Sequence, residues 1–527
     1  MRQDLTVRAL RSQLTPVFVV GVGLSLVFVL WAALSPQGFT AAGTSAQSFT
    51  VERFGWLYLA ATTFFVGFVI FLAASRRYGH LKLGRDDEKP EFSRVSWFAM
   101  LFQAGMGIGL VFWAASEPLA HFAAPPYGLA PPNTPAAGDI SLRYTFFHWA
   151  LHPWAIYAVV ALAIGYFNFR LGRSGLLSEV FRPLLGSRVD GPLGRAIDVL
   201  AILATLFGVA VSLGLGALQI ASGLNYLFLI PNTVPVQIAI IAITTVAFIA
   251  SAATGINRGI KWLSNASLVL AGLLLLFVLV TGPTVVQLDA FTQGLGSYVG
   301  DIIPMSFRLN AFAEETFPAE WTLFFWGTWI AWAPYVGSFI ARISRGRTIR
   351  EFVIAVLLVP SVIGIGWLAI FGAGAIELDK GLGGELSRVA SSDEARGLFT
   401  FLDQLPLALV ASLLAIGLVF VFFVAGADAG TIVLGRFSTK GILNPGRPVR
   451  IVWGMIMGAV AAVVIAAGGL DGLQSVSILA ALPFVVLLLT MCWALLRALR
   501  EDEAVRDAAA VKTREPAGAP PVAAEER

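Results

Sequence analysis

Charged residues are scarce in this chain of 527 residues. Asp, Glu, Lys and Arg make up 13% of it, hydrophobic residues make up 57%, and the mean hydropathy is +0.79. A soluble domain carries about twice that share of charge. Only one cysteine, Cys492, is present, which excludes an intrachain disulfide and argues against redox chemistry. The composition therefore predicts an integral membrane protein.

Motifs for enzyme chemistry are also missing. No G-x-x-x-x-G-K-[ST] run occurs, so nucleotide hydrolysis is not expected, and no nucleophile–base pair is recognisable. The four histidines are His80, His121, His148 and His152. We place His80 in the cytoplasm and His121 near the outer surface, with the other two hydrogen-bonded to backbone, so no metal site is predicted. The net charge of +4 needs no nucleic acid partner, because basic residues also face anionic lipid.

Long apolar runs are abundant instead. Each has about 20 residues, which is enough to cross a bilayer. We predict twelve spans, approximately at 14–35, 54–75, 96–122, 144–169, 196–223, 234–254, 260–282, 321–342, 350–376, 401–434, 450–468 and 475–497. With a cytoplasmic N-terminus, 30 of the 36 Lys and Arg residues fall in cytoplasmic segments. This asymmetry predicts that both termini are cytoplasmic, and we expect no cleavable signal peptide.

Three segments outside the spans have their own character. Residues 1–13 form a short cytoplasmic N-terminus. Residues 283–320 mix apolar and polar side chains, which predicts an amphipathic helix on the outer membrane surface. Residues 499–527 are rich in Ala, Pro and charge without apolar periodicity, so a disordered cytoplasmic tail is expected.

Two spans have sequences that favour an interrupted helix. The third contains Ala104-Gly-Met-Gly-Ile-Gly109, and the eighth contains Gly327, Pro334 and Gly337. Each would open a block of five spans, and an odd number inverts one block relative to the other, as in many transporters. We therefore expect two preceding helices and a cytoplasmic loop over 14–95, a first five-helix repeat over 96–282 and a second over 321–498.

The fourth and eighth spans also concentrate aromatic residues at mid-membrane positions. Trp329 and Trp332 lie in a stretch without Lys or Arg, although membrane tryptophans normally gather at the lipid headgroups. Indole faces attract cations that cannot donate hydrogen bonds, such as a quaternary ammonium. Pro153 is expected to kink the fourth span and to bring its rings toward one centre. The pattern predicts a cation-binding chamber, and the alternative is that the rings only pack helices together.

Several longer motifs together resemble the betaine/carnitine/choline transporter family, from about Pro16 to Arg500. The most specific are Tyr78–Gly84, Asp86–Ser93, Ala104–Leu110, Ser116–Leu119, His148–Tyr157 and Ala341–Phe352. The resemblance implies an all-α integral membrane fold of twelve transmembrane helices, with two LeuT-like five-helix inverted repeats after two helices. It also implies a homotrimer in a bacterial inner membrane, and alternating access with a quaternary-ammonium or zwitterionic solute.

The resemblance further implies a substrate site with two poles. The aromatic box would be Trp149, Trp154, Tyr157 and Trp329, with Trp332 and Phe324 beside it, and the glycine-rich pole would be Met106, Gly107, Ile108 and Gly109. Unwound backbone in that run would offer N–H groups to a carboxylate. Family members specialised for choline carry Asp at the position of Gly109, so glycine betaine is favoured here. Choline, carnitine and ectoine are the alternatives.

The chain departs from the family at the coupling-ion site. Sodium-coupled members have hydroxyl side chains where this chain has Ala425 and Gly426, which offer only backbone, whereas a hard cation needs several oxygens. The other candidate ligands are Ala104, Met106, Phe422, Thr205 and Tyr335. Proton coupling through Asp428 or Glu117 and plain exchange stay open beside sodium coupling. We interpret Glu117, which precedes Pro118, as a helix-end residue near the outer surface.

A secondary transporter is thus the leading hypothesis. Its partners would be the solute and membrane lipid, with no cofactor other than a coupling Na⁺ or H⁺. A channel would need a continuous polar lining, which these spans lack. A membrane osmosensor is the other alternative, and the short tails predict weak or absent osmotic activation.

Overall fold

The computed structural model describes residues 15–105, 107–254, 256–309, 311–312 and 316–514. Nearly all of them are helical, and the one isolated β-bridge in this part of the chain pairs Lys82 with Thr348. The helices are α2 (Pro16–Leu34), α3 (Pro36–Ala74), α4 (Arg94–Gly105), α5 (Ile108–Ala123), α6 (Pro135–Trp149), α7 (Leu151–Gly165), α8 (Arg182–Leu185), α9 (Pro192–Phe228), α10 (Val234–Thr254), α11 (Ile256–Thr281), α12 (Thr284–Ser306), α13 (Leu323–Ile343), α14 (Ile349–Gly381), α15 (Glu385–Ser392), α16 (Glu394–Asp403), α17 (Ala408–Ser438) and α18 (Arg447–Arg514).

The prediction of an all-α membrane protein is confirmed. Eight of the described helical segments, with α6 and α7 taken together, are long and apolar enough to cross a membrane, or nine if the bent pair of α11 and α12 counts as one span. The third predicted span divides into α4 and α5, of 12 and 16 residues, so neither half is long enough alone. The last two predicted spans lie in α18, which is interrupted at Gly469 (φ 54°, ψ −135°).

Threonine caps mark where several helices begin. Thr15, Thr134 and Thr348 precede α2, α6 and α14, and each side-chain oxygen accepts the backbone N–H three residues further on. Such a cap satisfies one of the N–H groups that have no partner within the helix. Proline follows two of the caps, where its fixed φ suits the first helical turn.

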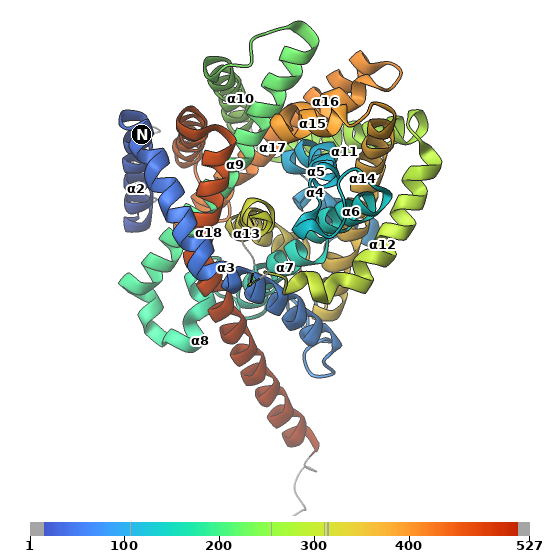
Figure 1. The fold of residues 1–527 in the computed structure, drawn as a ribbon. Helices are drawn as coiled ribbons and strands as arrows, with labels where there is room; N and C mark the ends of the chain where they lie inside the picture. The colour runs from blue at the N-terminus through green and yellow to red at the C-terminus, as the bar shows by residue number, and fades with distance from the viewer. Residues whose placement is uncertain (1–14, 106, 255, 310, 313–315, 515–527) are drawn as a thin grey trace, which may run out of the picture.

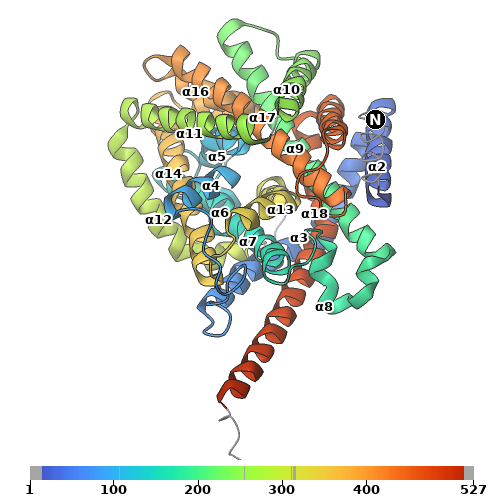
Figure 2. The same cartoon turned by 180° about the vertical axis from the view of Figure 1, so that it is seen from behind.

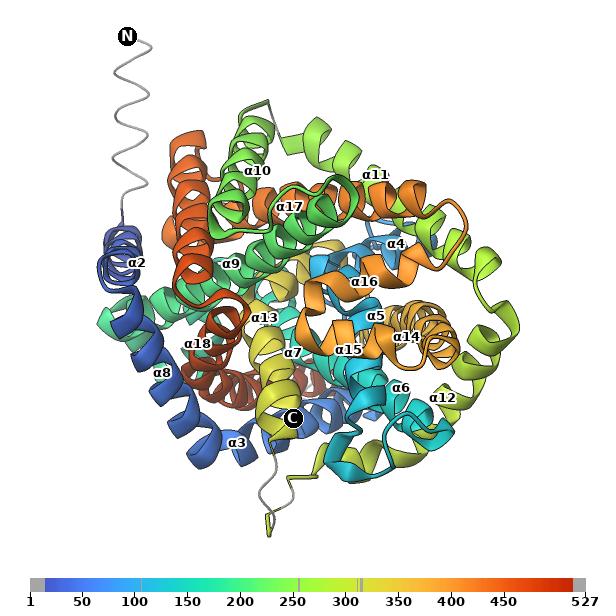
Figure 3. The ribbon, with the colours of Figure 1, turned by 45° about the horizontal axis from the view of Figure 1, so that its top comes forward.

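Helix α13 lies near the centre of the molecule in both side views (Figures 1 and 2). It packs most extensively on α7 and also contacts α9 and α18. Seen with the top brought forward, α15 and α16 cover α5 (Figure 3). The centre of the bundle is therefore built by segments that carry the predicted substrate residues.

Helix α12 falls within the segment predicted to be an amphipathic surface helix. It turns by 110° from α11 and curls around the outside of the bundle (Figure 1). Gln287 and Tyr298 on its inner side are buried, whereas Val285 and Ile303 face outward. Its location at the membrane surface stays a prediction.

Two expectations about local structure are wrong. Helix α13 runs without a break through Pro334. A Cβ on Gly327 would lie 3.0 Å from the Ile478 Cα, so this glycine serves close packing on α18 rather than unwinding. The tail is also not irregular throughout, because α18 continues to Arg514. Residues 499–514 are rich in Ala, Glu, Lys and Arg, which are good helix formers.

Two of the family-like motifs meet on the side of the bundle predicted to be cytoplasmic. Leu83 N donates to Arg347 O (2.8 Å), within a short antiparallel contact between residues 78–84 and 341–352. The Arg347 guanidinium also lies over the ring of Trp97, 4.5 Å from its centroid. These contacts join the start of α4 to the connection between α13 and α14.

Candidate functional site

The glycine-rich pole coincides with the break between α4 and α5. Gly107 is extended (φ −131°, ψ −160°) and α5 begins at Ile108, so the interruption predicted for the third span is confirmed at Gly107. The first N–H groups of α5 have no partner within the helix and sit at the positive end of its dipole. Met106 lies outside the described residues, and Ala104 belongs to α4.

A second helix break lies next to Trp149, the first residue of the predicted aromatic box. Ala150 has non-helical angles (φ −96°, ψ −118°) and separates α6, which ends at Trp149, from α7. Pro153 explains the position of this break. Its ring clashes with the carbonyl of Trp149, four residues earlier, and it has no N–H to donate to that carbonyl. The predicted effect of Pro153 thus occurs three residues upstream of the proline itself.

The four predicted box residues form a continuous chain of ring contacts. Trp149 and Trp329 meet edge to face with ring centroids 4.9 Å apart and planes at 70°. Tyr157 contacts Trp329 at 6.4 Å, and Trp154 contacts Tyr157 at 5.7 Å, both nearly perpendicular. All four side chains are at most 5% exposed. The structure therefore brings together α6, α7 and α13 residues that the sequence reasoning assigned to one site.

A small cavity lies against this wall. It is lined by Gly107, Gly109, Leu110, Trp113, Trp149, Val211, Ser212, Leu215, Phe324, Phe325, Thr328, Trp329 and Trp332. Six of these were predicted. Trp154, Tyr157 and Ile108 are not among the lining residues, and the Ile108 side chain instead packs toward Gly216 of α9.

The sequence reasoning missed several residues of the lining. Trp113 stands four residues after Gly109, and Phe325 stands four residues before Trp329. Residues four apart share one helix face. That spacing was a usable signal, whereas Ser212 of α9 had no comparable signal in the sequence.

The two glycines of the lining allow the indoles to approach the backbone. A Cβ on Gly109 would lie 3.2 Å from Trp149 Cη2, and a Cβ on Gly107 would lie 3.3 Å from Trp332 Cη2. Both distances are shorter than ordinary van der Waals contact. A larger residue at either position would push a ring out of place.

The indole N–H groups of three tryptophans that line the cavity donate hydrogen bonds to acceptors within the protein. Trp329 Nε1 donates to His148 O (2.9 Å), and Trp332 Nε1 donates to Gly208 O (2.6 Å). Trp149 Nε1 donates to Glu117 Oε2 (2.8 Å). With their N–H groups satisfied, the rings offer their electron-rich faces, which suit a methylated cation.

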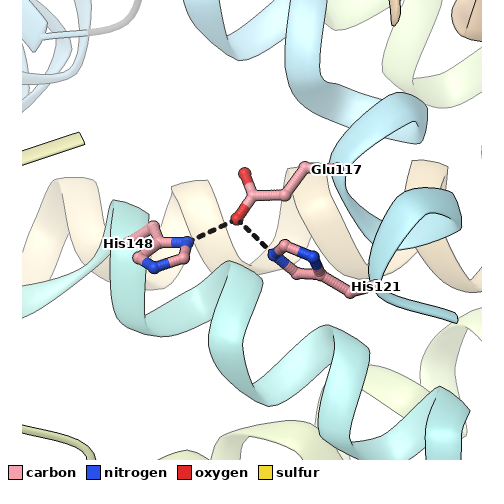
Figure 4. Close-up of side chains that lie close together, drawn as sticks. All are labelled: Glu117, His121 and His148. Carbon is pink, nitrogen blue, oxygen red and sulfur yellow. Dashed lines mark hydrogen bonds and ion pairs between the residues drawn. The ribbon is translucent and has the colours of Figure 1, made fainter. Parts of the chain in front are cut away.

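The predicted place of Glu117 is wrong, because this residue is fully buried beside the chamber wall. Its Oε1 lies 2.6 Å from His148 Nδ1 and 3.4 Å from His121 Nε2, and Figure 4 shows both imidazoles pointing at this oxygen. His148 Nε2 lies 3.0 Å from Thr322 Oγ1. Contacts between α5, α6 and the turn before α13 bury the carboxylate, and no local pattern encodes them.

The hydrogen-bond partners predicted for His148 and His152 are also wrong. The ligand atoms of Glu117, His121 and His148 lie within 4.8 Å of one another, a spacing that metal ligands adopt, although the 2.6 Å contact is a hydrogen-bond distance. His152 Nε2 pairs with the Ser306 hydroxyl (3.0 Å) rather than with backbone. His80 does contact backbone, through Nδ1 and Arg76 O at 3.0 Å.

The candidate ion ligands give a mixed result. Phe422, Ala425 and Gly426 are half-buried on α17, a continuous helix whose backbone carbonyls accept helical hydrogen bonds. Thr205 on α9 is fully buried, and its hydroxyl makes no hydrogen bond to the described residues. Tyr335 packs edge to face on Trp332, with ring centroids 5.8 Å apart.

Asp428 is a buried carboxylate on the same helix, α17. Its Oδ2 accepts from Ser251 Oγ (3.0 Å), while Oδ1 has no hydrogen-bond partner among the described residues. An intramembrane carboxylate is costly to keep and is usually functional. Asp428 therefore stays a candidate for the coupling group.

Comparison with known proteins agrees with this geometry. The family model described as betaine/carnitine/choline family transporter matches residues 16–504. A glycine betaine transporter of Bacillus subtilis is 49% identical over 495 residues, covering 93% of this chain and 95% of the relative. A probable glycine betaine transporter of Desulfitobacterium hafniense is 43% identical (92% and 97% covered), and an ectoine/hydroxyectoine transporter of Virgibacillus pantothenticus is 41% identical (93% and 97%). The chain belongs to the betaine/carnitine/choline family of transporters.

Proposed function

We propose that this protein imports glycine betaine across the cell membrane by alternating access. The observation that carries the proposal is the pairing of two poles in one cavity. The Trp149 and Trp329 rings form an apolar, electron-rich wall, and α5 begins after Gly107 on the same lining, with the positive end of its dipole there. A trimethylammonium group fits the first pole by cation–π attraction and a carboxylate fits the second.

The lining also favours a zwitterion over a simple cation. None of the residues that line the cavity is acidic or basic. A solute that carries both charges needs no counter-charge from the wall, whereas choline would. The relatives named as glycine betaine transporters support the same choice. Ectoine is the second candidate, because one relative of similar coverage is named for it.

For the energy source we propose a proton gradient acting through Asp428. Sodium is disfavoured because Ala425 and Gly426 bring no side-chain oxygen to a helix whose carbonyls are already bonded. Asp428 has one oxygen without a hydrogen-bond partner among the described residues. We further propose twelve spans with both termini cytoplasmic, two inverted five-helix repeats and a homotrimer, as the family resemblance implies.

Uptake by purified protein in liposomes tests these points together. Radiolabelled glycine betaine, choline, carnitine and ectoine are offered in parallel, with sodium and pH gradients imposed separately. We expect saturable glycine betaine uptake and counterflow that respond to the pH gradient and not to sodium. Uptake that does not saturate would indicate a channel, and preference for another solute would overturn the substrate assignment.

A further inference from the structure

One carboxylate stands directly behind the chamber wall. Glu117 lies on α5, eight residues after Gly109, and it does not line the cavity itself. Among the described residues its partners are the Trp149 indole and the imidazoles of His148 and His121, with no Lys or Arg. Burying a carboxyl group is costly even beside imidazoles, so its presence beside a cation-binding wall calls for an explanation.

The hydrogen bonds show how this carboxylate acts. An indole nitrogen can only donate, so Glu117 Oε2 accepts from Trp149. His148 Nδ1 lies 2.6 Å from Glu117 Oε1, and its Nε2 lies 3.0 Å from the Thr322 hydroxyl, which can donate or accept. Both carboxyl oxygens of Glu117 are therefore engaged, with Oε2 as the acceptor from Trp149. A charged acceptor makes a stronger hydrogen bond than a neutral one.

Glu117 is connected to both of the facing indoles of the wall. It holds the Trp149 ring directly, through the 2.8 Å hydrogen bond. It holds His148, whose backbone carbonyl accepts the N–H of Trp329 at 2.9 Å. These two rings meet edge to face at 4.9 Å. Negative charge at the N–H edge of an indole also increases the electron density of its face, which attracts the cation.

We propose that Glu117 is a positioning residue that sets the affinity of the chamber for the quaternary ammonium, acting through the hydrogen bond to Trp149. The inference rests on the proposed transport of betaine and deepens it. It places an acidic group behind the aromatic wall and not on the lining, so the carboxylate of the solute does not contact it.

The test compares Glu117→Gln with wild type in glycine betaine uptake and binding. Gln keeps an oxygen that accepts from Trp149 but removes the charge. We expect KM and Kd to rise at least about twofold, the lower end for coupled neighbours, with the maximal rate little changed. Ser306→Ala is the matched control. It removes the buried contact of the Ser306 hydroxyl with His152 and leaves Glu117 and its partners in place. Its affinity should equal that of wild type.

A double-mutant cycle isolates the route through the indole. Trp149→Phe keeps a ring but removes the N–H, so Glu117→Gln should add little to the loss in that background. Equal effects of Glu117→Gln in both backgrounds would overturn the inference, and so would an unchanged KM. If the Gln variant does not reach the membrane, Glu117→Asp serves instead. It shortens the side chain that reaches Trp149 but keeps a carboxyl group. An unchanged KM of this variant would also overturn the inference. A wild type without saturable glycine betaine binding would overturn the proposed function as well.

Discussion

Replacing Trp329 by leucine is the most direct test of the aromatic chamber. The substitution keeps the position apolar but removes a ring face that lines the cavity and meets Trp149 at 4.9 Å. A desolvated cation–π contact is worth about 2 kcal/mol, which corresponds to roughly 30-fold in affinity. The lost hydrogen bond to His148 O would add to this, since that carbonyl helps to fix the wall.

The assay is equilibrium binding of glycine betaine to purified protein, supported by the KM for uptake in liposomes. Trp326→Leu is the control, because Trp326 lies on the same helix and is fully buried but does not line the cavity. Its ring stacks instead on His152, with centroids 5.2 Å apart. We expect Trp326→Leu to lower the unfolding temperature without a comparable change in affinity. Trp329→Phe should be intermediate, since a smaller ring face remains.

Two results would refute the reasoning. If Trp329→Leu binds glycine betaine as tightly as wild type, the rings only pack helices and the chamber does not recognise the cation. If Trp326→Leu and Trp329→Leu lose affinity equally, the loss comes from disturbed packing of α13. Unfolding temperatures of both variants separate these cases, because a packing defect lowers stability wherever it lies.

Three further predictions concern the aromatic chamber and the candidate coupling residues on α17. Gly109→Ala places a Cβ 3.2 Å from Trp149 and should lower glycine betaine affinity about fivefold or more, whereas Gly417→Ala, where a Cβ meets nothing within 4 Å, should not. Asp428→Asn should abolish accumulation driven by a pH gradient but keep counterflow, and retained pH-driven accumulation would exclude Asp428 as the coupling group. Ala425→Thr combined with Gly426→Ser adds two hydroxyls on α17 and should make uptake respond to sodium, as an imposed sodium gradient would reveal.

The sequence predicted those parts of the structure that depend on local pattern. Apolar runs of span length gave the helices, because every backbone polar group in a bilayer must be satisfied within the segment. The break at Gly107 was predictable from closely spaced glycines. Trp149 and Trp329 were assigned to one site by the family resemblance, although 180 residues separate the two rings along the chain.

Features that arise from packing between distant segments were not predictable. Glu117 reads as a helix-end residue next to Pro118, yet it is buried because α6 and the turn before α13 close over it. Pro334 suggests a broken helix, yet α13 is continuous between α7 and α18, which pack on its two sides. In both cases the local sequence predicts one structure, and contacts with distant segments produce another.

The scarcity of charge in the chain is consistent with a site that recognises a charged solute. A fixed charge exposed in a low-dielectric chamber is expensive to desolvate and would attract one pole of a zwitterion while repelling the other. Ring faces at Trp149 and Trp329 and the N–H groups at the start of α5 carry only partial charges, so each pole meets its complement at lower cost. The Glu117 carboxyl group is separated from the cavity by the Trp149 indole. This arrangement explains why the carboxylate touches the wall and is absent from the lining.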